Sequence, residues 1–253
     1  MMGMFTIAWK ELRDYFNSVI GYTILTLLLF VTGGFYWALL QSYAQMSAQA
    51  AGNPMMGQLP PLTEVVIGYL FSNLSIILVL AAPLLTMRLL AEERRNHTLE
   101  LLMTAPVSSL EIVLGKFLGS WGFMVVALAL TAHYPVLLFQ VGSPDLGPIL
   151  TCYVGALLLS GVFVALGLMT SAFTQHQLVS GMVSFGAGLF LLVIMSWLVG
   201  EDAGPLAKFF SLTDHYDGFT KGLIKLESVT YLVSLIVLFL FTTQQRIETM
   251  RRQ

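Results

Sequence analysis

The residues that could carry chemistry in this chain are few, and they lie far apart in the sequence. Its histidines lack the His-Glu-x-x-His spacing of a zinc protease and fall on four separate segments, at His97, His133, His176 and His215. The single cysteine cannot form an internal disulfide. The Gly-x-x-x-x-Gly-Lys-Ser/Thr loop that binds nucleotide phosphates is also missing. The sequence therefore predicts no catalytic site, no metal site and no cofactor in this chain.

The segment 88–106 holds the densest group of charges. Four of them are consecutive and form an elbow at 92–95, namely Glu92, Glu93, Arg94 and Arg95. Beyond the elbow, Asn96 or Thr98 can cap a short helix over 97–104, and Glu100 suits its positively polarised first turn. Pro106 disfavours helix at the residue before it and so ends this helix.

The helix expected at 97–104 has an apolar side formed by Leu99, Leu102 and Met103. One interpretation is that this side docks into a groove of another protein, because short amphipathic helices bind in that way. The alternative is an ordinary amphipathic loop that rests on a bilayer.

The elements that position this segment are membrane helices. Hydrophobic residues make up 57% of the 253-residue chain and charged residues only 10%, which excludes a soluble enzyme, a disordered chain and a nucleic-acid-binding domain. No charged residue occurs at 15–63, 65–87, 117–144, 146–200 or 228–245. Because a span needs about 20 apolar residues, the stretch 146–200 must hold two. We therefore expect an all-α membrane protein with six spans, at about 18–40, 63–87, 109–139, 148–173, 178–199 and 228–243. Ser108 and Glu111 form a capping box that starts the third.

The N-terminal residues 3–17 predict an amphipathic helix in the membrane interface. Its apolar side consists of Phe5, Trp9, Leu12 and Phe16, which recur at helical spacing. Trp9 and Tyr15 are side chains suited to the depth of the lipid headgroups.

The distribution of basic residues predicts the orientation of the chain. Nine lie on one side of the expected spans, namely Lys10, Arg13, Arg88, Arg94, Arg95, Lys116, Arg246, Arg251 and Arg252. Three lie on the other side, Lys208, Lys221 and Lys225. The positive-inside rule places the first side, and with it both termini, in the cytoplasm.

The loop at 200–227 is the second candidate site. It contains Asp214, His215, Asp217 and Lys221, and an apolar helical face formed by Tyr216, Phe219, Leu223 and Ile224. These features predict two short re-entrant helices before the sixth span, whose apolar face enters the outer leaflet. The loop is interpreted either as an outer gate or contact for an auxiliary subunit, or as a solvated cap.

The segment 92–106 resembles the signature of ABC-2-type transporter permeases, in which an acidic and basic elbow precedes a Thr-Leu-Glu-x-Leu-Leu helix and a proline. In this chain it reads Glu92-Glu93-Arg94-Arg95-x-x-Thr98-Leu99-Glu100-Leu101-Leu102-x-Thr104-Ala105-Pro106. His97 departs from the family, which often has glycine there. The resemblance extends over the whole chain, 1–253, as one transmembrane domain. The loop at 209–224 is further similar to the gliding-motility-associated, GldF-like group.

The resemblance implies a permease subunit of an ATP-driven exporter in the bacterial inner membrane. Its partners would be two copies of a separate ATPase, which would bind ATP and Mg, and a second transmembrane subunit, identical or homologous. An auxiliary subunit with an extracytoplasmic domain would be another partner, besides membrane lipid. Residues 92–106 would be the coupling interface. The alternative is an ATP-independent scaffold or secondary transporter, and the substrate stays open.

Overall fold

A computed structural model describes residues 2–52, 60–96, 98, 107–194 and 211–251, and this part of the chain is helical and has no strand. Five helical stretches are long and apolar enough to cross a membrane. They are Val19–Gly52, Glu64–Arg95, Ser109–Val141, Leu146–Phe173 and Leu226–Arg251. The all-helical prediction is confirmed for this part of the chain, and five of the six expected spans correspond to a helical stretch long and apolar enough to cross a membrane.

Two of these stretches are single helices that extend well beyond the predicted bounds. Helix α2 spans Val19–Gly52 instead of 18–40, and α13 spans Leu226–Arg251 instead of 228–243. The extension of α2 is rich in alanine, glutamine and methionine, which are good helix formers, so no residue before Gly52 interrupts it. Its 34 residues make a rod of about 51 Å, longer than a hydrocarbon core of roughly 30 Å. The uncharged loop expected at 41–62 is therefore helical as far as residue 52.

The second and third spans are each built from several pieces. The second begins with the π-helical turn η1, Glu64–Gly68, continues as α3, Tyr69–Thr86, and leads into the short helix α4, Ala91–Arg95. The third is broken into α6, Ser109–Leu130, and α7, His133–Val141. Pro135 accounts for this break, since it has no N–H for the carbonyl of Thr131 and its ring crowds that group.

The predicted capping box at the start of α6 is confirmed. The Ser108 hydroxyl accepts a hydrogen bond from the backbone N–H of Glu111 at 3.2 Å. The Ser108 N–H in turn donates to Glu111 Oε2 at 3.1 Å. Two N–H groups that the helix cannot satisfy itself thus find partners, which fixes where the span begins.

Helix α8, Leu146–Phe173, is the centre of the bundle, and most of its residues are buried. It packs against α3, α6, α13 and α9, Gln177–Leu189. Helix α9 continues into the π-helical turn η2, Phe190–Ile194. The predicted fifth span, 178–199, is described only this far, and its remainder lies outside the described residues.

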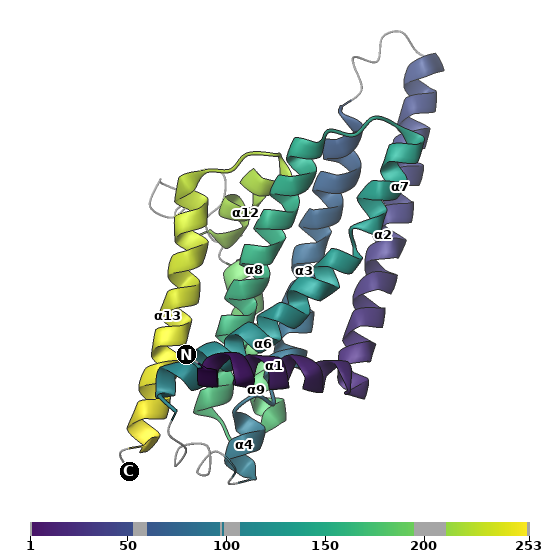
Figure 1. Ribbon diagram of the computed structural model, residues 1–253. Helices are drawn as coiled ribbons and strands as arrows, with labels where there is room; N and C mark the ends of the chain where they lie inside the picture. Colours follow the sequence, from purple (N-terminus) through teal and green to yellow (C-terminus); the bar gives the residue numbers. More distant parts are fainter. Residues whose placement is uncertain (1, 53–59, 97, 99–106, 195–210, 252–253) are drawn as a thin grey trace.

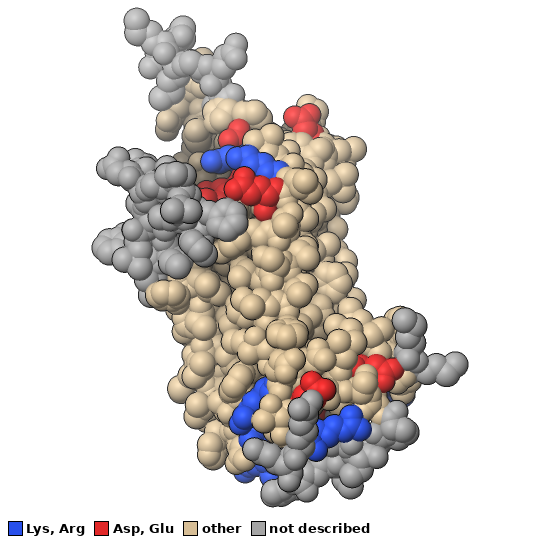
Figure 2. Space-filling view, turned by 90° about the vertical axis from the view of Figure 1, so that its left-hand side faces the viewer, with Lys and Arg blue, Asp and Glu red and all other residues tan. Residues whose placement is uncertain are grey.

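The two ends of the bundle carry different elements. Helix α1, Met2–Phe16, runs across one end, which also carries α4 and the last turns of α13 (Figure 1). Helix α12, Leu212–Thr220, lies towards the opposite end. We call these the α1 end and the α12 end. Between them, Figure 2 shows a wide belt without charged side chains, as expected for a surface that faces lipid.

Candidate functional site

Helix α1 packs closely on α6 because two glycines of α6 leave room for it. A Cβ at Gly115 would lie 2.8 Å from the Ile7 side chain, and one at Gly119 would lie 2.6 Å from Glu11 Cβ. Small residues allow membrane helices to approach in this way. The predicted helix at 3–17 is present as α1, and Phe5 and Trp9 of its predicted apolar side are exposed.

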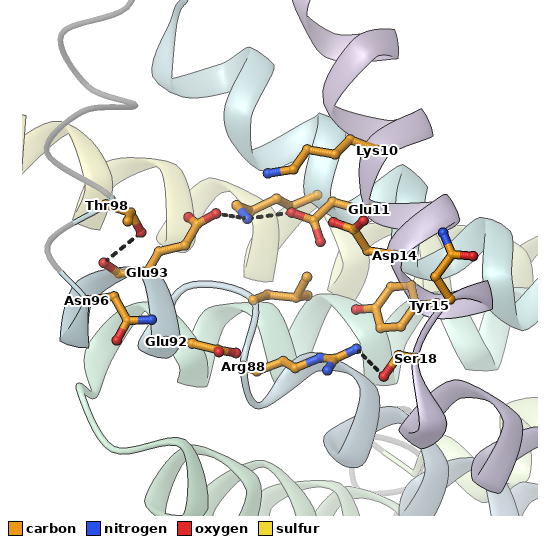
Figure 3. A pocket seen from close by; sticks show the side chains of 13 residues that line it. Lys10, Glu11, Asp14, Tyr15, Ser18, Arg88, Glu92, Glu93, Asn96 and Thr98 are labelled. Carbon is orange, nitrogen blue, oxygen red and sulfur yellow. Dashed lines mark hydrogen bonds and ion pairs between the residues drawn. The ribbon is translucent and has the colours of Figure 1, made fainter.

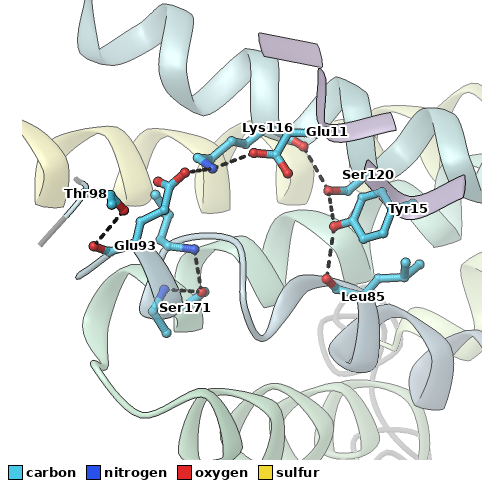
Figure 4. Close-up of polar contacts among 10 residues, drawn as sticks. Glu11, Tyr15, Leu85, Glu93, Thr98, Lys116, Ser120 and Ser171 are labelled. Atoms are coloured by element: carbon cyan, nitrogen blue, oxygen red, sulfur yellow. Dashed lines mark hydrogen bonds and ion pairs between the residues drawn. The ribbon is translucent and has the colours of Figure 1, made fainter. Parts of the chain in front are cut away.

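Lys116 lies at the centre of the site, beneath α1. Its side chain is 1% exposed, and its Nζ atom is 2.7 Å from Glu11 Oε1 and 2.7 Å from Glu93 Oε1 (Figure 4). These carboxylates belong to α1 and α4, whereas Lys116 belongs to α6. A buried ammonium is costly unless it is paired and hydrogen-bonded. The double ion pair therefore ties three elements together.

Tyr15 forms a second tie between α1 and the bundle. Its hydroxyl donates to the carbonyl of Leu85 at 3.0 Å and lies 3.0 Å from Ser120 Oγ (Figure 4). Burial of the ring raises the pKa of the Tyr15 hydroxyl, so it stays protonated and can donate. The prediction that Tyr15 lies among lipid headgroups is wrong, because Tyr15 is 1% exposed. Its hydroxyl group instead forms hydrogen bonds inside the protein.

The elbow is held against the end of α8. The backbone N–H groups of Leu90 and Ala91 both donate to Ser171 Oγ, each at 3.0 Å. Arg94 Nη1 donates to the carbonyl of Ala172 at 2.9 Å. The bond from Arg94 satisfies a carbonyl at the end of α8 that has no partner within the helix. Together with the ion pairs of Lys116, these bonds link the elbow to α8, α6 and α1.

The structure separates the predicted coupling residues into two groups. Glu93 and Arg94 turn inward and anchor the elbow, as described above. Glu92, Arg95 and Thr98 are exposed, and Thr98 Oγ1 donates to the carbonyl of Glu93 at 3.3 Å. The other members lie outside the described residues, namely Leu99, Glu100, Leu101, Leu102 and Pro106, and with them nearly all of the predicted helix at 97–104.

A polar cavity of about 790 Å³ opens between α1 and the elbow (Figure 3). Its walls include three cationic side chains, Lys10, Arg88 and Lys116, and four carboxylates, Glu11, Asp14, Glu92 and Glu93. Arg88 stacks over the Tyr15 ring at 5.5 Å, and its Nη2 donates to Ser18 Oγ at 3.4 Å. We call this space the α1–α4 cavity.

Helix α12 is part of the second predicted site, and it is packed rather than free. Phe219 is fully buried, with its Cβ against the position of Gly155 on α8. The Tyr216 hydroxyl donates to the carbonyl of Phe71 at 2.9 Å, and His215 stacks on Tyr231 at 4.3 Å. Asp214 and Lys221 are exposed, and Asp217 is half-buried. One of the two expected short helices is thus present as α12. Residues 200–210 of the same loop lie outside the described residues.

The apolar face predicted for this loop is partly wrong. Tyr216 and Phe219 are buried, but Leu223 and Ile224 are 56% and 57% exposed. Gly222, with φ +81°, ends the helix before them. The N–H of Leu223 donates to the carbonyl of Gly218, and that of Gly222 to Phe219, which is the hydrogen-bond pattern of a glycine-terminated helix. The helical spacing therefore stops short of Leu223.

The single cysteine and one of the four histidines lie in expected spans and have structural roles. Cys152 is fully buried in α8, and its Sγ lies 3.6 Å from the carbonyl of Phe219. His133 is exposed, and its Nδ1 is 2.6 Å from the carbonyl of Leu130, next to the break between α6 and α7. Its partner is therefore three residues away in the same predicted span.

Comparison with known families identifies the protein class. A model described as ABC-2 family transporter protein matches residues 5–246, almost the whole chain. The chain belongs to this family. It is therefore a multi-pass membrane protein, the permease component of a transporter, in a family that lacks ATPase motifs and implies an ATPase partner. No curated protein matches the chain.

Sequence reasoning missed the inner residues of the permease site. The sequence identifies Lys116 only as a basic residue that contributes to orientation, and no pattern in it assigns a role at this site to Glu11, Ser120 or Ser171. One signal was available: Lys116 lies two turns inside a span, where an ionisable side chain needs a partner. Which carboxylates pair with it could not be read, because Glu11 is 105 positions away in sequence.

Proposed function

We propose that this permease is the transmembrane subunit of an ATP-driven exporter, and that a separate ATPase acts on it through residues 92–106. The double ion pair of Lys116 carries the proposal. It joins the elbow to α1 and α6 at the only place where the described cationic and acidic side chains form buried ion pairs. A push on the elbow would thus be transmitted to α1 and α6 at once.

The geometry of the elbow supports this mechanism. Its inner residues, Glu93 and Arg94, hold α6 and α8, while Glu92 and Arg95 are exposed on the same short helix. An ATPase that binds the outer side, together with the helix expected at 97–104, would move α1, α6 and α8 as one body. ATP and Mg would be held by the ATPase.

The assembly follows from the same proposal. Two ATPase subunits would act on a pair of transmembrane subunits, identical or homologous, in a bacterial inner membrane, with both termini in the cytoplasm. Residues 1–253 would form a single transmembrane domain of the GldF-like group. Helix α12 would then face the extracytoplasmic side, where an auxiliary subunit could bind its exposed Asp214 and Lys221.

The test is co-purification of an ATPase with the permease from its native membrane. Replacing Glu100 or Leu101 with arginine should abolish ATPase co-purification while the permease stays in the membrane. Arg13→Gln, an exposed change on α1 outside the segment, is the control and should retain the ATPase. Full co-purification with the Glu100→Arg and Leu101→Arg variants would contradict the coupling site. A permease that never binds an ATPase would instead support the ATP-independent scaffold.

A further inference from the structure

The α1–α4 cavity contains charges of both signs that form no ion pair with another described residue. Lys116, Glu11 and Glu93 neutralise one another. Among the described residues, no ion pair involves the remaining charged wall residues, namely Lys10, Asp14, Arg88 and Glu92. Arg88 uses one of its N–H groups on Ser18, so most of its five donors stay available. The cavity therefore offers two cations and two carboxylates to a ligand.

The cavity also adjoins a surface that faces lipid. Asn17 and Ser18 line it, and the next residue, Val19, begins the apolar helix α2 and is 82% exposed. Tyr22, one turn further along α2, is exposed as well. On another side of α1, Phe5 and Trp9 are exposed, as expected for a helix at the membrane surface. The cavity thus lies where lipid headgroups meet the protein.

We propose that the α1–α4 cavity binds the headgroup of a zwitterionic phospholipid. The phosphate would lie at Arg88, since anionic oxygens form strong hydrogen bonds with such donors. The ammonium would lie at Glu92, on the same side of the Lys116 ion pair (Figure 3), and the acyl chains along the exposed start of α2. Lipid bound here would hold α1 against the elbow.

The charges of the wall favour a zwitterion over an anionic lipid. The three cations and four carboxylates of the cavity leave it with one excess negative charge, so a headgroup with net negative charge gains less than one that also brings an ammonium. Glu93 Oε2 supports the same conclusion, because it is shielded from solvent and accepts no hydrogen bond from a described residue. A cationic donor inside the cavity would reduce the cost of that buried oxygen.

The experiment uses the full permease alone, so its result does not depend on the ATPase or on transport. The protein is incubated with vesicles of phosphatidylethanolamine and phosphatidylglycerol in equal amounts, extracted in detergent and analysed for retained lipid by mass spectrometry. We expect phosphatidylethanolamine to be enriched. Arg88→Gln with Glu92→Gln should lower its retention about tenfold, as expected from the loss of charge-assisted hydrogen bonds. Arg13→Gln with Glu248→Gln, which removes the same charge types elsewhere, should retain it.

Three results would overturn the proposal: equal retention of both lipids, enrichment of phosphatidylglycerol, or unchanged retention in the Arg88→Gln/Glu92→Gln variant. Soluble glycerophosphoethanolamine is the further probe. If micromolar amounts of it displace the lipid, the ligand is the free headgroup and the phospholipid assignment is wrong. Should the double variant fail to fold, Arg88→Gln alone decides, because it removes the donors to the phosphate and should by itself lower retention.

Discussion

Lys116 shows how one buried charge can join elements that are distant in the sequence. It lies in the third span, yet its two carboxylate partners come from α1 and α4. A buried ion pair adds little stability compared with an apolar replacement of both partners, but removing one partner is costly. The pair is therefore best understood as a device that fixes relative position, and this distinction can be measured.

We predict that Lys116→Met destabilises the permease by on the order of 3 kcal/mol, because Glu11 and Glu93 lose their shared counter-ion. Thermal unfolding in detergent would show this as a lower midpoint. The matched control is the variant that also carries Glu11→Gln and Glu93→Gln, which should recover most of the loss. A single variant that unfolds like the wild type would show that the ion pair fixes nothing.

Asp217 gives a pH-dependent prediction at the other end of the molecule. Burial raises the pKa of its carboxyl, Lys221 partly offsets this, and Asp214 adds to it. Between its unfolded value, about 3.9, and the higher folded value, the folded state binds more protons. The free energy of unfolding therefore falls as pH rises through this window, and the penalty is complete above it.

Asp217→Asn should accordingly raise the unfolding midpoint at pH 7 and flatten its dependence on pH above about 4. The exposed Asp214 provides the control, since Asp214→Asn should leave most of that dependence in place. Melting curves across pH 4 to 8 are the measurement. A wild-type midpoint that increases steadily with pH, and an Asp217→Asn variant that increases equally, would contradict the sign.

At the scale of elements, the junction of α1 and α6 depends on glycines at specific positions. A Cβ at Gly119 would lie 2.6 Å from Glu11 Cβ and 2.8 Å from the carbonyl of Ala8. At Gly122, one turn further along the same helix, a Cβ would lie 3.7 Å from Leu12, an ordinary contact. Alanine substitutions at these two positions therefore distinguish the effect of close packing from the effect of helix propensity.

We predict that Gly119→Ala pushes α1 away from α6 and costs about 1 to 3 kcal/mol, the usual range for overpacking. Gly122→Ala should be neutral or stabilise slightly, because alanine favours helix over glycine by up to about 1 kcal/mol. Unfolding midpoints of the two variants provide the comparison. The close contact would be refuted if both variants behaved alike.

Local sequence patterns predicted the presence of helices more accurately than the residues at which the helices end. The periodicity of Phe5, Trp9, Leu12 and Phe16 correctly gave α1, and Ser108 with Glu111 correctly gave the start of α6. The far end of α2 was missed because an uncharged Ala/Gln/Met segment can be helix or loop, and only its helix propensity distinguishes them. The break in the third span could have been read from Pro135. The ion pair and hydrogen bonds of the elbow could not be predicted from the sequence, because they depend on tertiary packing between distant segments.

At the scale of the whole molecule, the charges define two polar ends and a belt for lipid. Figure 2 shows charged side chains gathered at both ends of the visible face. The α1 end holds the described members of the larger basic group, among them Lys10, Arg94 and Arg251, while Lys221 and Lys225 lie beside α12. The positive-inside rule then assigns the α1 end to the cytoplasm.

This assignment is tested by single cysteines at exposed positions of both ends. Thr6 on α1 and Thr249 on α13 lie at the α1 end, and Gln49 lies on the projecting part of α2. In intact spheroplasts, an impermeant thiol reagent should label Thr6→Cys and Thr249→Cys only after the membrane is opened, whereas Gln49→Cys should react at once. The native Cys152 gives no background because it is fully buried. If the two α1-end cysteines react in sealed spheroplasts and Gln49→Cys does not, the permease has the opposite orientation and its elbow cannot meet a cytoplasmic ATPase.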